Sequence, residues 1–247
     1  MERITMTIAH GGKNIYGFPI GILMLNSHFP RVPGEMGNAS TWDFPVLYKV
    51  VQGASPQRVV AENDPALLEP FIQAAQELEA QGVRAITTNC GFLAMFQTEL
   101  RQAVNVPVFT STLMMVPLVY SMMSPDKRVG IMTVNKSTLG DKVIEGAGCA
   151  HIPKAVVGME NEEEFTHMIL EDRLEMDVDK CRAEHVKVAK KLVEENPDVG
   201  AIVLECTNMP PYSKDIQEAT GLPVFDIVSL VNFVHHALVK NHPTGIM

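Results

Sequence analysis

The chain has 247 residues, of which 46% are hydrophobic, and it carries a formal net charge of −9. This length allows one large buried core or two compact ones, and the acidic balance argues against nucleic acid as a partner, because phosphate backbones are bound by clustered Lys and Arg. No apolar run approaches 18 residues and no leader pattern opens the sequence, so we expect a cytoplasmic protein without a membrane partner.

The first half of the sequence predicts strands and helices in alternation. After a turn-rich lead at residues 1–19, a strand is expected at 20–25. The loop at 27–45 is long, contains the sole tryptophan and is expected to close over a ligand. Asp64-Pro65 is typical of a helix start, and Gly82 of its end. The half is completed by strands at 83–88 and 106–109 and by helices from Cys90 to about 104 and at 113–122.

The second half predicts the same alternation. Its expected strands lie at 129–134, 155–159, 200–204 and 222–225, and its expected helices at 137–146, from 162, and at 178–195, 210–219 and 229–240. Alternating strands and helices predict an α/β fold with mainly parallel sheets. Right-handed crossovers then place all loops that follow strands on one edge of each sheet, where ligands bind in open α/β sheets.

An internal repeat relates the two halves. Cys90 and Cys206 each end an apolar strand, and a Pro-Val-Phe sequence follows each of them at the same distance. Upstream, the strand that ends in Asn26 corresponds to the strand that ends in Asn135. The repeat predicts two similar lobes with a pseudo-two-fold relation, lobe 1 comprising 1–115 and 228–247 and lobe 2 comprising 116–227. The two thiols are expected to face one cavity between the lobes.

The cysteines are the candidate catalytic groups. No Cys-x-x-Cys pair or nearby His suggests a zinc site. Cys149 and Cys181 are expected to be small buried residues. A cysteine at the start of a helix is expected to have a lowered pKa, since the helix dipole and free N–H groups stabilise its thiolate. With Cys90 and Cys206 on opposite faces of a substrate, one thiolate would remove a proton from a carbon and the other thiol would deliver one, which inverts that carbon.

Polar side chains near these strand ends are the candidate substrate-binding groups, because enolate-like charge requires hydrogen-bond donors. They are Asn26, Ser27, Asn89, Gly91, Asn135, Ser137, Thr138, Thr207 and Asn208. Arg31, in the long loop, is the expected partner of a distal substrate carboxylate if the loop closes.

These residues resemble the cofactor-independent aspartate/glutamate/hydantoin racemase superfamily over nearly the whole chain. The resemblance is carried by Asn26-Ser27, Thr88-Asn89-Cys90-Gly91, the run from Val129 to Thr138, and Leu204-Glu205-Cys206-Thr207. It implies two α/β lobes with the site between them, one catalytic cysteine from each lobe, no cofactor or metal, and often a homodimer.

Three departures bear on the substrate. Members that act on amino acids usually show Cys-Asn-Thr at the first site and Asp-Ser after the first strand, whereas this chain has Cys90-Gly91-Phe92 and Asn26-Ser27. Glutamate-type members have Cys-Thr-His at the second site, and here Asn208 stands in place of His. Two acid/base auxiliaries are thus replaced by amides, which argues against glutamate itself as the substrate.

The sequence favours an isomerase, a racemase or epimerase that acts at a carbon next to a carboxylate or carbonyl. Two alternatives stay open. The same cavity could serve a decarboxylase similar to arylmalonate decarboxylase or an isomerase similar to maleate isomerase, although two cysteines favour racemisation because decarboxylation requires one proton donor. A protein that binds a small carboxylate without turnover is the non-enzymatic alternative.

Overall fold

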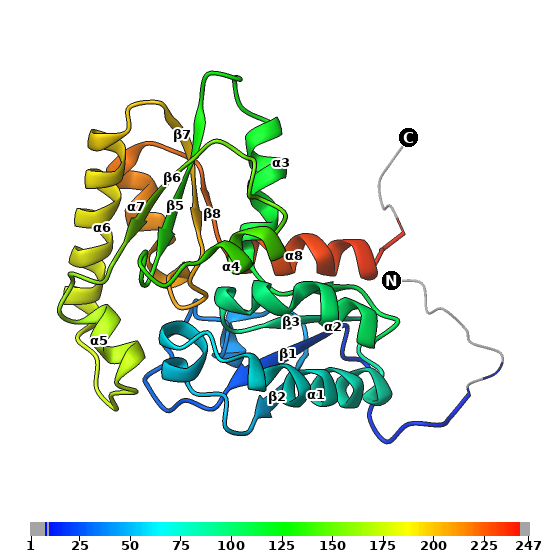
Figure 1. Cartoon of the computed structure of the whole chain (residues 1–247). Coiled ribbons are helices and arrows are strands. Elements are labelled where there is room, and N and C mark those ends of the chain that lie inside the picture. Colours follow the sequence, from blue (N-terminus) through cyan, green and yellow to red (C-terminus); the bar gives the residue numbers. More distant parts are fainter. Residues whose placement is uncertain (1–7, 9, 243–247) are drawn as a thin grey trace.

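The computed structural model describes residues 8 and 10–242 and consists of two α/β lobes, stacked one above the other in Figure 1. Each lobe contains a four-stranded parallel sheet, with the order β2-β1-β3-β4 in the first and β6-β5-β7-β8 in the second. The strands are β1 (Ile20–Leu25), β2 (Val46–Val51), β3 (Ala85–Thr88), β4 (Val108–Phe109), β5 (Arg128–Thr133), β6 (Lys154–Gly158), β7 (Val199–Leu204) and β8 (Val224–Phe225). The matching strand orders confirm the predicted two-lobed fold and its internal repeat.

Strand β2 was not predicted from the sequence. It lies at the edge of its sheet, paired only with β1, and most of its side chains are half-buried. Lys49 interrupts its apolar residues, whereas β1 and β3 are buried along their whole lengths. The residues from 46 to 51 are therefore the counterpart of β6 in the repeat.

The helices of the first lobe follow the predicted pattern closely. Asp64 caps the helical segment by accepting a 2.9 Å hydrogen bond from the amide of Ala66, and Gly82 ends it with a φ of 99°. The helical elements are η1 (Ala39–Thr41), η2 (Gln57–Ala61), η3 (Pro65–Leu67), α1 (Leu68–Gln81), η4 (Gly91–Phe96), α2 (Gln97–Ala103), η5 (Thr112–Met115) and α3 (Val116–Ser121).

Two helices of the second lobe begin later than predicted. The helical elements of this lobe are α4 (Asp141–Gly146), α5 (Phe165–Leu170), α6 (Val178–Glu195), η6 (Pro210–Tyr212), α7 (Ser213–Thr220) and α8 (Ile227–Leu238). The helix expected from residue 137 starts at Asp141, because the Asn135 side chain accepts hydrogen bonds from the amide and hydroxyl of Ser137 and holds a turn there. The helix expected from Glu162 starts at Phe165, where the carboxylate of Glu184 accepts hydrogen bonds of 2.8 and 2.9 Å from the amides of Glu164 and Phe165. Within the described residues, every helix is too short or too polar to cross a bilayer.

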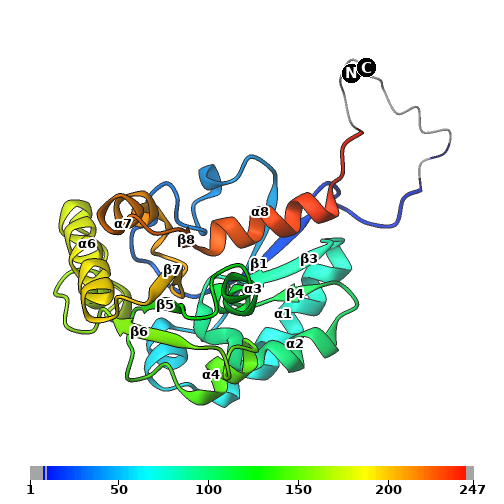
Figure 2. The ribbon, with the colours of Figure 1, turned by 90° about the horizontal axis from the view of Figure 1, so that it is seen from above.

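The chain crosses between the lobes twice. Helix α3 follows β4 of the first sheet but packs on β5 of the second. Helix α8 follows β8 of the second sheet and lies at the junction of the lobes (Figure 2), where the ring of His235 stacks on Phe44 of the first lobe with 3.6 Å between ring centroids. Each lobe thus contacts a helix that follows a strand of the other lobe.

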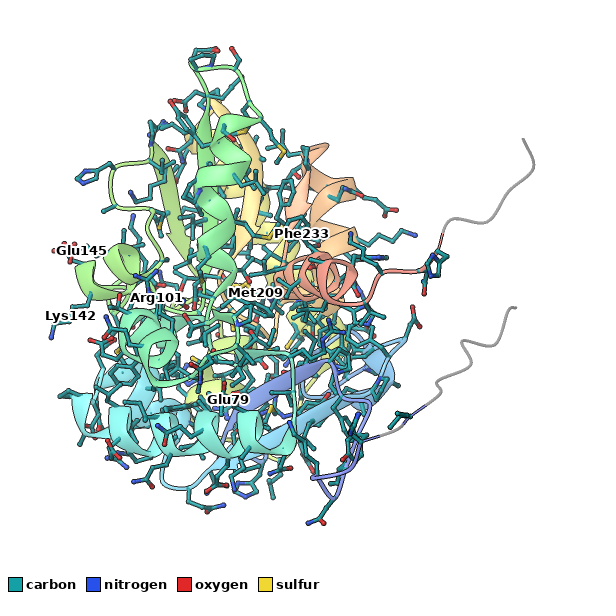
Figure 3. The ribbon with its side chains drawn as sticks, turned by 90° about the vertical axis from the view of Figure 1, so that its right-hand side faces the viewer. Glu79, Arg101, Lys142, Glu145, Met209 and Phe233 are labelled. Carbon is teal, nitrogen blue, oxygen red and sulfur yellow. The ribbon has the colours of Figure 1, made fainter. Side chains whose placement is uncertain are left out.

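Helix α4 brings the lobes into close contact. It packs on η4, and Figure 3 shows it beside the helices of the first lobe, with Lys142 and Glu145 on its outer side. A Cβ atom at Gly146 would lie 2.0 Å from the carbonyl oxygen of Ala94. The approach of α4 to η4 therefore requires glycine at this position.

Candidate active site

A narrow cavity of about 20 Å³ lies between the lobes at the carboxyl ends of the strands. Its lining is mainly apolar and contains both candidate cysteines. The lining residues are Leu25, Phe29, Pro56, Val60, Asn89, Cys90, Gly91, Phe92, Val134, Ile169, Glu205, Cys206, Thr207 and Asn208. In this structure the cavity has room for about one water molecule.

The two cysteines occupy equivalent places in the repeat. Cys90 follows β3 and immediately precedes η4, and Cys206 follows β7 before η6. Their exposed fractions are 8% and 7%. Because β3 and β7 hold the same position in their sheets, the fold brings one thiol from each lobe to the same cavity.

A hydrogen bond joins the two cysteine loops across the lobes. The buried hydroxyl of Thr207 donates to the carbonyl oxygen of Asn89. The Asn89 side chain in turn accepts a 2.7 Å bond from the amide of Leu25, which ties the loop to the end of β1. The residue before Cys90 and the residue after Cys206 are therefore fixed relative to each other.

Glu205 is a site residue that sequence reasoning did not select. Its carboxylate is 1% exposed, lines the cavity and accepts a 2.8 Å hydrogen bond from the hydroxyl of Thr133 through Oε2. Its Oε1 is buried and has no hydrogen-bond partner among the described residues. Burial raises the pKa of Glu205 to about 7, although the bond from Thr133 acts in the opposite direction. An acidic residue directly after an apolar strand and before a candidate cysteine was the available signal.

The absence of a side chain at Gly91 allows the Glu205 carboxylate to approach the loop that carries Cys90. A Cβ atom at Gly91 would lie 2.3 Å from Oε1 of Glu205 and 2.5 Å from its backbone oxygen. Any side chain at position 91 would therefore collide with the second lobe. At this position the resemblance leads one to expect Asn after the first cysteine. The glycine found here leaves the space that Glu205 occupies.

The expected lowering of the thiol pKa values is corrected by the structure. Burial, followed by the nearby Glu205 carboxylate, raises the pKa of both Cys90 and Cys206. Backbone amides of Phe92 and Leu93 do act to lower the pKa of Cys90, as a helix start should, but they are outweighed. Burial therefore favours the neutral form of both thiols, contrary to the expectation from the helix starts.

Six of the twelve predicted site residues line the cavity and six do not. Cys90, Cys206, Asn89, Gly91, Thr207 and Asn208 are in the lining, and Asn26, Ser27, Arg31, Asn135, Ser137 and Thr138 are outside it. The other two cysteines, Cys149 and Cys181, are fully buried away from the cavity, as predicted. Within the described residues, no group of three His, Cys, Asp or Glu side chains is placed to hold a metal ion.

Arg31 has partners within its own loop. Its guanidinium forms a 2.6 Å ion pair with buried Glu35 and donates a 2.8 Å hydrogen bond to the hydroxyl of Ser27. It also lies over the ring of Phe29, 4.6 Å from the ring centroid. Because Phe29 lines the cavity, Arg31 supports the cavity wall in this structure.

The long loop bridges the lobes. The carboxylate of Asp172, which follows α5 in the second lobe, accepts hydrogen bonds from the amides of His28 and Phe29, of 2.6 and 3.0 Å, and pairs with the His28 ring. Trp42 lies elsewhere, 7% exposed, with its indole N–H donating to the carbonyl of Met36. The part of the loop that covers the cavity is therefore its start, around Phe29.

Replacing Asp172 with Ala is expected to loosen this bridge. Two backbone donors would lose a charged acceptor, so the amides of His28 and Phe29 should exchange hydrogen with solvent at least about tenfold faster, which corresponds to about 1.4 kcal/mol. Hydrogen exchange followed by NMR measures this directly. Asp43→Ala, at an exposed acidic residue of the same loop, is the matched control. Unchanged exchange at Phe29 in the Asp172 variant would show that the bridge does not hold the loop.

Known proteins resemble this chain in sequence and in structure. A dimethylsulfoniopropionate lyase from Durusdinium sp. clade D is 31% identical over 240 residues, which cover 94% of this chain and 79% of that protein. Unliganded arylmalonate decarboxylase superposes with a TM-score of 0.56 at 15% identity, covering 91% of this chain and 94% of that one. An aspartate racemase homologue from Pyrococcus horikoshii OT3 superposes with a TM-score of 0.55 at 18% identity, covering 88% and 98%.

The family model described as Asp/Glu/Hydantoin racemase matches residues 50–231. This segment contains the end of β2, the strands β3 to β8, both cysteines and Glu205. On the strength of that match, the chain belongs to the Asp/Glu/hydantoin racemase family.

Proposed function

We propose that this protein is a cofactor-independent enzyme that moves protons at a carbon next to a carboxylate or carbonyl and thereby racemises or epimerises its substrate. The observation that carries the proposal is the presence of Cys90 and Cys206, one from each lobe, in the lining of one cavity. Thiolates are effective bases and thiols effective acids at carbon, and a pair from opposite sides serves both faces of a planar intermediate.

The cavity lining supports a small substrate with an apolar part. Apolar side chains from both lobes, including Leu25, Phe29 and Ile169, surround the cysteines. The described lining contains no Lys or Arg, so a substrate carboxylate would be held by the amide side chains of Asn89 and Asn208 and by backbone N–H groups. Such donors also stabilise the enolate-like charge that develops when the proton leaves.

A second candidate is β-elimination, favoured by the similarity to dimethylsulfoniopropionate lyases. Its first step is the same: a thiolate removes the proton next to the carboxylate. The electron pair of that C–H bond then forms a C=C bond, and the bond from the β-carbon to sulfur breaks. Dimethyl sulfide leaves with the electron pair and acrylate remains, while the proton stays on the cysteine until it passes to solvent. Elimination needs one cysteine as base, whereas inversion needs both.

The two candidates are separated by incubation in deuterium oxide. Chiral amino acids, hydantoins and substituted carboxylic acids are expected to gain deuterium at the carbon next to the carboxylate or carbonyl and to lose optical activity, both followed by NMR and polarimetry. Dimethylsulfoniopropionate is assayed in parallel for acrylate and dimethyl sulfide.

Cys149→Ala is the control, because this buried cysteine lies outside the cavity and its loss should leave turnover unchanged. If acrylate forms and no chiral compound exchanges its hydrogen for deuterium, β-elimination would replace racemisation as the proposed function. Binding without exchange or elimination would support a protein that has lost turnover.

The homodimer implied by the family resemblance stays a prediction. Exposed apolar side chains lie on the two helices that cross between the lobes, at Leu118 of α3, at Met122 directly after α3 and at Phe233 of α8. Figure 3 shows Phe233 on the outer side of α8.

A further inference from the structure

Glu205 carries a buried carboxylate oxygen that has no partner. Its Oε2 accepts a 2.8 Å hydrogen bond from the Thr133 hydroxyl, whereas its Oε1 is buried without a hydrogen-bond partner among the described residues. Oε1 lies against Gly91 of the first lobe, where a Cβ atom would be 2.3 Å away. Both Glu205 and Gly91 line the cavity between the lobes. A buried unpaired carboxylate oxygen is costly, and it therefore marks a place where a ligand group can bind.

The carboxylate is held in place by the second lobe. Thr133 ends β5 and Glu205 follows β7, and these two strands are neighbours in one sheet. Gly91, by contrast, belongs to the first lobe. Because the cavity has room for about one water molecule in this structure, a substrate enters only when the lobes separate. Separation moves Gly91 away and exposes Oε1 to the widened cavity, while the bond from Thr133 keeps the orientation of the carboxylate.

The cavity contains no positive charge that would balance this carboxylate. Its described lining has no Lys, Arg or His. The guanidinium of Arg31 lies over the ring of Phe29, but it is already paired with buried Glu35. A simple carboxylate substrate would therefore place a second negative charge beside Glu205, and a dicarboxylate would add a third, which is costly in a buried space. A substrate that carries its own cation avoids this cost.

We propose that Glu205 is a specificity-determining residue whose carboxylate binds the positively charged group of an onium carboxylate, a small acid that carries an ammonium or sulfonium group. Oε1 is the atom that faces the cation, and Oε2 stays bonded to Thr133. Phe29 and Phe92 also line the cavity, and aromatic rings attract cations. This inference rests on the proposed function, since it names the class of acid at whose carbon the proton is moved.

The protonation of Glu205 provides a readout of such binding. Burial raises the pKa of Glu205 to about 7, so its charged and neutral forms are both populated near neutral pH. The described groups that act on it are the Thr133 hydroxyl and the Val134 amide, and the thiols of Cys90 and Cys206 are nearby with raised pKa values. None of these groups carries a positive charge. A bound onium group should therefore lower the pKa of Glu205, whereas a bound anion should raise it.

The first experiment uses the unmodified protein, labelled with ¹³C at the glutamate carboxyl groups, and the Glu205 signal is assigned by its loss in Glu205→Gln. NMR follows the midpoint of this signal with pH, with and without each compound. Dimethylsulfoniopropionate or alanine should lower the midpoint by more than one pH unit, which corresponds to a more than tenfold preference for the charged form. Their neutral isosteres, 4-methylpentanoate and 2-methylpropanoate, should leave it unchanged or raise it. The pair that gives the shift distinguishes a sulfonium from an ammonium.

The second experiment compares affinities by isothermal titration calorimetry at about pH 8. The preferred onium carboxylate should bind at least about tenfold more tightly than its neutral isostere, and Glu205→Gln should remove this preference. Glu162→Gln, at a buried acidic residue outside the cavity, is the matched control and should keep the preference. Equal affinities for the onium carboxylate and its isostere in the unmodified protein would overturn the proposal.

The NMR titration can also contradict the proposal without any variant. A midpoint that rises with every carboxylate would show that Glu205 binds ligands as a neutral acid. A Glu205 signal that neither onium carboxylate moves, at the highest soluble concentration, would show that the unpaired oxygen does not bind a cation.

Both experiments measure binding and are independent of turnover. A preference for onium carboxylates together with no exchange or elimination would leave the role of Glu205 intact and remove the proposed function. Exchange or elimination without that preference would do the reverse.

Discussion

Changing either Cys90 or Cys206 to Ser is expected to reduce racemisation by about 10²- to 10⁴-fold, the range typical of a lost general acid or base. A serine hydroxyl is a far weaker base than a thiolate at neutral pH. Because both thiols line one cavity, neither can replace the other on the opposite face of the substrate. The measurement is loss of optical activity of each enantiomer by the two single variants.

The two serine variants should differ in the enantiomer that still exchanges its hydrogen with deuterium oxide, since each variant keeps the base for one face. The double variant should be scarcely slower than either single one, because the cysteines act as a unit. Cys149→Ala supplies the control for loss of a buried thiol. If one serine variant racemised at nearly the normal rate, a one-cysteine reaction such as elimination would be favoured instead.

Replacing Gly91 with Ala is expected to disrupt both the fold and the site. The new methyl group would lie 2.5 Å from the backbone oxygen of Glu205, and a backbone atom at the end of β7 cannot rotate away as a side chain could. Overpacking of this kind costs about 1–3 kcal/mol, which lowers the Tm by roughly 2–12 °C in a chain of this size. Displacement of Glu205 and Cys206 should also reduce activity on the order of 100-fold.

Gly140→Ala is the matched control for the Gly91 variant. The nearest atom to a Cβ at Gly140 is 4.0 Å away, and its φ of −77° suits any residue, so stability should change by no more than about 0.5 kcal/mol. Thermal unfolding followed by circular dichroism gives the comparison. A Gly91→Ala protein with a normal Tm and normal activity would show that the lobes can separate at this contact without consequence.

The fold could be predicted from the sequence to a large extent because buried parallel strands have a clear signature. Strands β1, β3, β5 and β7 are buried along nearly their whole length and contain short apolar runs, and the repeat of the Cys90 and Cys206 elements indicated that they belong to two equivalent sheets. The sequence was less informative where partners decide the structure. Strand β2 is half-exposed, and the start of α4 depends on a side-chain turn at Asn135.

The site was predictable where its residues are neighbours of the cysteines in the chain. Asn89, Gly91, Thr207 and Asn208 line the cavity because the cysteine loops carry them there. Glu205 was missed because its role depends on the space left by Gly91 of the other lobe, a contact between residues far apart in the sequence. Arg31 was selected for its charge, and its ion pair with Glu35 became visible only in three dimensions.

The double crossing of the chain has a consequence for how the lobes can move. The two connections, one entering α3 and one entering α8, meet where α8 packs on η5, the element that precedes α3. We expect this pair of connections to restrict relative rotation of the lobes more than a single connection would. Any opening of the lobes is then expected on the side of Phe29 and Asp172, and the two cysteine loops would return to the same register on closing.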